Sequence, residues 1–213
     1  MSSVAVIDYG MGNLHSIAKA LQHAAPEVTV LVVSDKQSIL VADRVVLPGV
    51  GAMRECMAAL QENELIDVIS IVAKNKPFLG VCLGMQALLT SSEENGGIES
   101  LNLIPGSVKH FANGLLDAKG ERLKIPHVGW NQMHQHEHPL WANIPQNSHF
   151  YFVHSYFAQP DNNQHIAAST EYPNEFACAI AKDNIFATQF HPEKSHTAGL
   201  QLLSNFLRWD GQA

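Results

Sequence analysis

Strand-like and helix-like patterns alternate along the first half of the chain. The run at 4–8 is short, apolar and β-branched, whereas apolar residues within 13–24 recur three and four positions apart, as on one face of a helix. Pro26 ends that helix, because proline cannot continue it. The same alternation predicts further strands at 28–33, 44–47 and 78–81, and further helices at 35–42, 53–60, 64–73 and 83–91.

The second half of the chain has a different pattern, in which short apolar runs are separated by turn residues and predict mainly antiparallel hairpins. Alternating strands and helices build parallel sheets that are covered on both faces. We therefore expect an α/β fold with a mostly parallel central sheet, helices on both faces and an antiparallel β extension. Because no linker-like segment divides the chain, we expect one domain spanning residues 1–213. The strands predicted in the second half are 107–111, 149–158, 166–170, 176–182 and 185–190, and a helix at 198–207 closes the fold.

Composition and charge narrow the possible functions. The chain has 213 residues, of which 46% are hydrophobic and 15% charged, and a net charge of −7 with no basic block. We therefore expect no nucleic-acid partner and no membrane partner. The beginning of the chain does not resemble a signal peptide, and no stretch approaches the ~18 apolar residues of a membrane span. Three widely spaced cysteines indicate no disulfide framework, so a cytoplasmic setting is the default expectation.

Cys82 lies between Gly80 and Gly84, at the predicted junction of a strand and a helix. This is the pattern of a nucleophile elbow, in which a sharp turn strains the backbone of the nucleophile and leaves no room for side chains two residues away. The start of a helix favours the reactive thiolate, and the Leu83 N–H has no partner within the helix and can donate to an oxyanion. Taken alone, the pattern is also compatible with a small core cysteine between two packing glycines.

A cysteine nucleophile needs a base, and the base needs a group that orients it. Pro192 favours an extended backbone at His191, and in an extended chain His191 and Glu193 point to the same side. Alone, these residues are also compatible with a loop that carries a solvated charge pair. Together with the elbow they predict a Cys–His–Glu arrangement.

A second oxyanion donor is expected at Gly49, Val50 and Gly51, after the predicted strand 44–47. The ends of parallel strands share the crevice in which ligands bind, and glycine lets the backbone approach a substrate. A plain turn before a helix explains the same residues equally well.

Six motifs together resemble those of a known family. GVCLGMQ at 80–86 and QFHPEKS at 189–195 resemble the class I, triad-type glutamine amidotransferases, which have a flavodoxin-like fold. Within that class the chain is similar to the glutaminase subunits that serve imidazole glycerol phosphate synthesis in the histidine pathway. The motifs that carry this closer resemblance are DYGMGN at 8–13, LPGVGA at 47–52, PHVGWN at 126–131 and FVHSYF at 152–157.

The resemblance implies a reaction. Cys82 would attack the side-chain amide of glutamine, with His191 as base and then acid and Glu193 as its orienter. A glutamyl thioester would form, and water would release glutamate. Ammonia would pass to a cyclase subunit with a (β/α)₈ barrel in a heterodimer, where imidazole glycerol phosphate and an aminoimidazole-carboxamide ribonucleotide are made. The resemblance implies no metal or organic cofactor for the glutaminase step.

The resemblance also assigns residues around the triad. Gln86 would lie near the substrate glutamine, and the backbone of His154, Ser155 and Tyr156 would hold its amino-acid end. The oxyanion strand would change orientation when the complex is active. The residues implied to face the cyclase are Gly12, Asn13, Pro126, Gly129, Trp130 and Asn131.

Two other motifs do not change this interpretation. GMGNLH at 10–15 resembles the start of a dinucleotide fingerprint but lacks its final glycine, and the histidine-rich run at 134–138 reads as a polar loop before Pro139 rather than a metal site. Cys56 and Cys178 are expected to be inert core thiols. The open alternatives are a glutaminase subunit of another triad amidotransferase, a stand-alone cysteine hydrolase, and an inactive binding or regulatory module.

Overall fold

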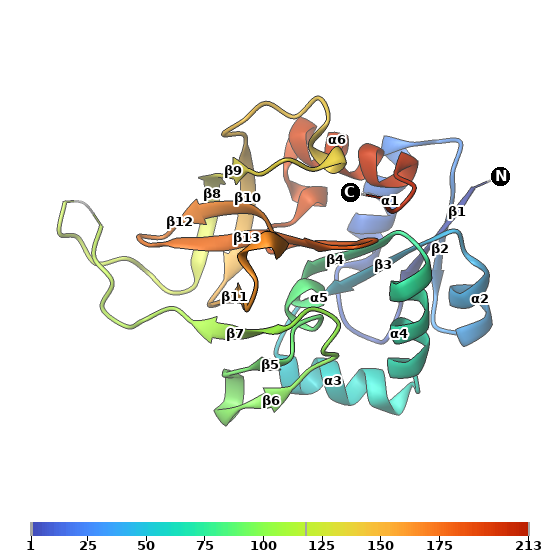
Figure 1. Ribbon diagram of the computed structural model, residues 1–213, viewed down its shortest axis with the longest axis horizontal. Coiled ribbons are helices and arrows are strands. Elements are labelled where there is room, and N and C mark those ends of the chain that lie inside the picture. The colour runs from blue at the N-terminus through green and yellow to red at the C-terminus, as the bar shows by residue number, and fades with distance from the viewer. Residues whose placement is uncertain (1, 118, 213) are drawn as a thin grey trace.

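A computed structural model describes residues 2–117 and 119–212, and its core is a sheet that is parallel in its first half (Figure 1). The parallel strands lie in the order β2–β1–β3–β4–β14. Alternate residues of each strand point to opposite faces, so both faces must be covered. The bounds of these strands are β1 Ser3–Ile7, β2 Thr29–Val33, β3 Arg44–Gly49, β4 Phe78–Cys82 and β14 Ile185–Thr188.

Helices cover both faces of the parallel strands, as expected (Figure 1). On one face, α1 and α6 pack against Val4, Val6 and Leu79; on the other, α2, α3 and α4 pack against Val45 and Phe78. The two cores are thus separated by the sheet itself. The bounds of these helices are α1 Leu14–Ala24, α2 Lys36–Val41, α3 Met53–Glu62, α4 Ile66–Asn75 and α6 His196–Arg208.

The antiparallel extension continues the same sheet beyond β14. β13 pairs antiparallel with β14, and the order then runs β13–β11–β7–β5–β6, with β12 pairing β13 and β9. This arrangement confirms the expected fold class. The bounds are β5 Ser91–Ser92, β6 Ile98–Glu99, β7 Gly106–His110, β9 His134–Gln135, β11 Tyr156–Pro160, β12 Ile166–Glu171 and β13 Glu175–Lys182.

The prediction of one strand at 149–158 is wrong. The chain bends at Ser155, so that β10 (His149–His154) pairs with β8 (His127–Gln132) in a separate two-stranded sheet, whereas β11 joins the large sheet. The β-strand propensity of the sequence is similar on both sides of the bend, so only the different pairing partners of β10 and β11 reveal that the strand is broken. The strand β8 was not predicted.

The helix predicted at 83–91 is also too long, because α5 spans only Leu83–Gln86. After it, the carbonyl groups of Ala87, Leu88 and Leu89 accept hydrogen bonds from the backbone of residues 101–104 instead of extending the helix. Residues 2–117 and 119–212 also contain four short 3₁₀ helices: η1 Glu94–Gly96, η2 Pro139–Trp141, η3 Asn163–His165 and η4 Pro192–Lys194. In the part of the chain that the structure describes, no helix is long and apolar enough to span a membrane.

Candidate active site

Cys82 occupies a strained turn between β4 and α5. Its φ and ψ are 55° and −111°, a conformation that non-glycine residues rarely adopt. A Cβ on Gly84 would lie 1.9 Å from the Leu47 carbonyl oxygen, and one on Gly80 would lie 3.0 Å from the Cβ of Ala187. The position of Gly84 therefore requires glycine and that of Gly80 is tightly packed, which is the geometry that the elbow pattern predicts.

His191 and Glu193 form a buried pair beside this turn. The His191 Nδ1 and a Glu193 carboxylate oxygen are 2.9 Å apart, and the two side chains are 5% and 3% exposed. His191 is extended, but Pro192 begins the 3₁₀ helix η4, so a tight turn rather than an extended strand aligns the two residues. The Ser195 hydroxyl donates to the His191 carbonyl (2.6 Å) and accepts the Tyr151 N–H (3.0 Å), which fixes the loop.

The surroundings of His191 favour its charged form. Burial alone would lower the pKa of this imidazole, but its interactions with Cys82 and Glu193 outweigh burial and raise the pKa to about 9. Because Nδ1 is held by Glu193, Nε2 is the ring atom left for the thiol. This pairing can move a proton between Cys82 and His191, which nucleophilic catalysis by a thiol requires.

The other two cysteines lie away from this arrangement. Burial raises the pKa of Cys56 to about 11, and it raises the pKa of the fully buried Cys178 still further. Neither thiol borders the cavity at Cys82. Both fit the expectation of inert core residues.

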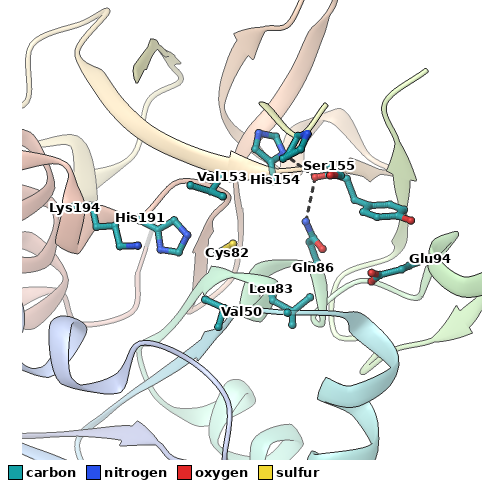
Figure 2. A pocket seen from close by; sticks show the side chains of 13 residues that line it. Val50, Cys82, Leu83, Gln86, Glu94, Val153, His154, Ser155, His191 and Lys194 are labelled. Atoms are coloured by element: carbon teal, nitrogen blue, oxygen red, sulfur yellow. Dashed lines mark hydrogen bonds between the residues drawn. The ribbon is translucent and has the colours of Figure 1, made fainter. Parts of the chain in front are cut away.

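A cavity of about 330 Å³ opens in front of Cys82, which lies between His191 and Gln86 (Figure 2). This volume suits a small amino acid. The structure also brings Glu94, Val153 and Lys194 to the cavity, which were not selected from the sequence. The predicted site residues that line the cavity are Val50, Gly51, Cys82, Leu83, Gln86, Pro126, His154, Ser155, Tyr156 and His191.

Gln86 is held in place by two hydrogen bonds beside the cavity. Its amide nitrogen donates to the Gln189 side chain (2.9 Å) and to the Tyr156 carbonyl (3.1 Å). Gln189 is itself fully buried, and its amide nitrogen lies 3.8 Å from the Cys82 sulfur. Gln189 was not selected from the sequence, although it lies two residues before His191 in the same motif.

The predicted oxyanion segment lies beside the elbow. Gly49 is the register partner of Cys82, and a Cβ there would lie 2.6 Å from the hydroxyl of Tyr9. The Tyr9 hydroxyl donates to the Pro48 carbonyl (2.9 Å) and so anchors the start of the segment. Beyond it, Val50 is 40% exposed and Gly51 has a φ of +99°. Tyr9 was not selected from the sequence, because its partner lies 39 residues away.

Glu94 contributes a carboxylate to the cavity. It accepts the Met53 N–H at the start of α3 (2.7 Å), and it lies across the cavity from Lys194 (Figure 2). Charges of both signs at one cavity suit a ligand that is itself a zwitterion, such as an amino acid.

The histidine-rich run at 134–138 does not assemble a metal site. The His136 ring bonds the Ile166 carbonyl (2.8 Å), whereas His138 is packed against Phe186 and Trp209. Within residues 2–117 and 119–212, no group of three His, Cys, Asp or Glu side chains is arranged to hold a metal ion.

Of the residues expected to face a partner, Pro126 lines the cavity, and Gly129, Trp130 and Asn131 lie in β8. Asn13 caps α1 by accepting the Ser16 N–H, and the Asn131 amide donates to the Glu171 carbonyl (2.9 Å). Trp130 is 45% exposed and stacks on His196, with ring centroids 4.8 Å apart and planes 4° apart. Gly12 packs near Pro48, and Gly129 has a φ of +138° in β8. Their contact with a partner stays a prediction.

Comparison with known proteins identifies the class to which this fold and site belong. The family model described as glutamine amidotransferase class-I matches residues 5–209. The "Imidazole glycerol phosphate synthase subunit HisH" of Methylococcus capsulatus is 62% identical over 99% of this chain and 98% of its own length. The protein of the same name from Nitrosococcus oceani is 58% identical over 99% of both chains. The chain therefore belongs to the class I glutamine amidotransferase family and, within it, to the branch of the HisH subunits.

Solved structures agree on the fold. A crystal structure of a glutamine amidotransferase superposes with a TM-score of 0.72 at 16% identity, covering 96% of this chain and 97% of the other. The structure of PurLQS from Thermotoga maritima superposes with a TM-score of 0.70 at 14% identity, covering 97% and 98%. The expected fold, the expected enzyme class and the resemblance stated from the sequence motifs are thus confirmed.

Proposed function

We propose that the chain is the glutaminase subunit of an imidazole glycerol phosphate synthase in histidine biosynthesis, and that it hydrolyses glutamine to glutamate and ammonia. The single observation that carries the chemistry is the strained Cys82 beside the buried His191–Glu193 pair at one cavity. The names of relatives more than half identical to the chain support the pathway.

In this proposal His191 takes the proton of Cys82, and the thiolate attacks the side-chain amide carbon of glutamine. The protonated imidazole then gives its proton to the leaving ammonia, and a glutamyl thioester remains. Water, deprotonated by His191, releases glutamate and restores the thiol. The Glu193 carboxylate accepts the Nδ1–H of His191, so that Nε2 faces the reacting atoms.

The oxyanion of each tetrahedral intermediate needs backbone donors. The Leu83 N–H is one candidate, because it begins α5 without an acceptor inside the helix. The segment Gly49, Val50 and Gly51 supplies the other. We propose that this second donor is turned away until the partner binds, because Gly49 is still buried in β3, whereas Val50 beyond it is 40% exposed and Gly51 has a φ of +99°.

The amino-acid end of glutamine would bind at the far side of the cavity. Ser155 and Tyr156 offer backbone groups there, Glu94 offers a negative charge for the ammonium group, and Gln86 is fixed nearby. This arrangement leaves the side-chain amide of the substrate directed to Cys82.

Ammonia would pass to a (β/α)₈-barrel cyclase subunit in a heterodimer, which makes imidazole glycerol phosphate and an aminoimidazole-carboxamide ribonucleotide. Exposed apolar side chains near the cavity support such a partner: Val50, Val128, Trp130 and Val153 are 40%, 55%, 45% and 37% exposed. Apolar surface of this kind is typical of an interaction site. Gly12, Asn13, Pro126, Gly129 and Asn131 complete the proposed interface. We place the complex in the cytoplasm, where free thiols such as Cys56, Cys82 and Cys178 persist.

Substitution of the proposed nucleophile tests this function. Cys82→Ser is expected to abolish glutamate release from glutamine while leaving binding to the cyclase intact, and Cys178→Ala, which lies outside the cavity, is the matched control. Glutamate release at the normal rate by Cys82→Ser would overturn the assignment.

A further inference from the structure

The side chains of two buried histidines, His127 of β8 and His154 of β10, have no part in the chemistry above. They face each other in the two-stranded sheet as register partners and are 4% and 6% exposed. The His127 Nδ1 and the His154 Nε2 are 2.9 Å apart. Histidine is costly to bury without a polar partner, so this pair requires an explanation.

The groups at the two ends of the pair determine which ring nitrogen of each histidine carries the proton. The His154 Nδ1 lies 2.8 Å from the Tyr156 carbonyl, which can only accept, so Nδ1 carries the proton and Nε2 accepts. His127 must then donate from Nδ1, which leaves its Nε2 to accept from the Asn131 amide at 3.5 Å. Each hydrogen bond in this series is donated in the same direction, from β8 toward the cavity. Burial lowers the pKa of His127 to about 4 and of His154 to about 3, so both rings are neutral, as the chain requires.

This series of hydrogen bonds ends at the Tyr156 carbonyl group, which lies at the proposed substrate site. The Tyr156 carbonyl also accepts the Gln86 amide (3.1 Å), and Ser155 and Tyr156 line the cavity (Figure 2). Ser155 is the bend at which the chain leaves the small sheet and enters the large one. The His154 side chain therefore spans this bend and ties its two sides together.

Aromatic packing alone does not account for the pair. His127 is stacked between Phe152 and Tyr172, with ring centroids 5.1 and 4.1 Å away, and His154 contacts Phe111 and Phe176. Phenylalanine would fill the same places without burying a polar ring. What the two imidazoles add is the directed chain of hydrogen bonds.

We propose that His127 and His154 are positioning residues that hold the Ser155–Tyr156 backbone in place for the amino-acid end of the substrate glutamine. This inference rests on the proposed glutaminase function. A group that positions the substrate backbone acts on binding more than on the chemical step. Loss of this positioning is therefore expected to raise KM for glutamine.

A matched pair of variants at His127 separates hydrogen bonding from packing. His127→Phe keeps the stack between Phe152 and Tyr172 but removes the donor, whereas the amide nitrogen of His127→Asn occupies nearly the place of Nδ1 and can still donate to His154. In the complex with the cyclase and its nucleotide, His127→Phe should raise KM for glutamine about fivefold to tenfold, as expected for one lost hydrogen bond to a buried group, with kcat within about twofold. His127→Asn should keep a KM close to that of the unaltered protein.

An unchanged KM in His127→Phe would overturn the inference. So would an equal rise of KM in both variants, because the donor that His127→Asn retains would then make no difference to binding. Both results leave glutamate release by the unaltered complex intact, whereas failure of the proposed function would appear as its absence. Melting temperatures of the two variants, measured alongside, show whether either change acts through folding.

Discussion

At the scale of single residues, the site depends on a few side chains held by partners distant in sequence. Cys82, His191 and Glu193 could be selected from the sequence because each sits in a pattern with a local mechanical reason: glycines around a turn, or a proline between two polar residues. Gln189, Glu94 and Tyr9 could not, because their contacts join residues 39 to 107 positions apart. A side chain that acts through such a contact leaves no local pattern.

The pair His191–Glu193 leads to a prediction at this scale. Glu193→Gln removes the charge that helps to raise the pKa of His191 to about 9, so that pKa should fall, and kcat for glutamate release should fall by about 100-fold or more. NMR titration of His191 and steady-state kinetics measure the two effects. Glu27→Gln, at an exposed carboxylate, is the control. Unchanged kcat in Glu193→Gln would show that the carboxylate does not orient the imidazole during the reaction.

At the scale of elements, the alternation of strand and helix along the first half of the chain was predicted closely. The patterns are strong there, because β1, β3 and β4 are buried almost throughout and each helix buries one face, although the edge strand β2 is partly exposed. The two-residue strands β5, β6 and β9 are too short to show a period. The break at Ser155 and the early end of α5 are set by pairing with distant segments, which local propensity does not contain.

The turn from β4 to α5 leads to a prediction at the scale of elements. Gly84→Ala would push a Cβ to 1.9 Å from the Leu47 carbonyl, so β3 and α5 must separate, at an expected cost of about 3 kcal/mol or more in the free energy of unfolding. Gly114→Ala is the control, because its position is open and only its φ of +78° opposes a side chain, at a cost of about 1 kcal/mol. Urea unfolding measures both variants. Equal losses would mean that the close approach at Gly84 does not constrain the turn.

At the scale of the whole molecule, the antiparallel extension continues the parallel sheet, and both contribute residues to one cavity. Cys82 comes from the parallel part, whereas Ser155 and Tyr156 come from the extension, and β14, which precedes His191, joins the two. We therefore propose that residues 1–213 form one domain. Its unfolding should be a single cooperative transition.

The buried histidines predict how the stability of this domain depends on pH. His127, His138 and His154 have folded-state pKa values lowered by burial to between about 3 and 4, so the unfolded chain takes up their protons first and stability falls as pH drops from about 6.5 toward 4. His191 has a pKa raised to about 9, so its contribution is complete below about 6.5 and is lost as pH rises toward 9.

Stability should therefore be greatest near pH 6.5 and lower on both sides, with the melting temperature about 5 °C or more lower at pH 4.5. Thermal unfolding between pH 4 and pH 10 measures this profile. A melting temperature that keeps rising below pH 6 would contradict the account of the buried histidines, and two separate transitions would contradict the single domain.

The measurement that tests the central claim most directly is glutamate release from glutamine by this chain, first alone and then with the cyclase and its nucleotide. Because a missing oxyanion donor lowers the rate by roughly 100-fold to 1,000-fold, the account predicts stimulation of about 100-fold or more when the complex is complete. Equal rates in the two conditions would leave Cys82 a candidate nucleophile, but they would contradict the gated oxyanion segment and the assignment to this complex.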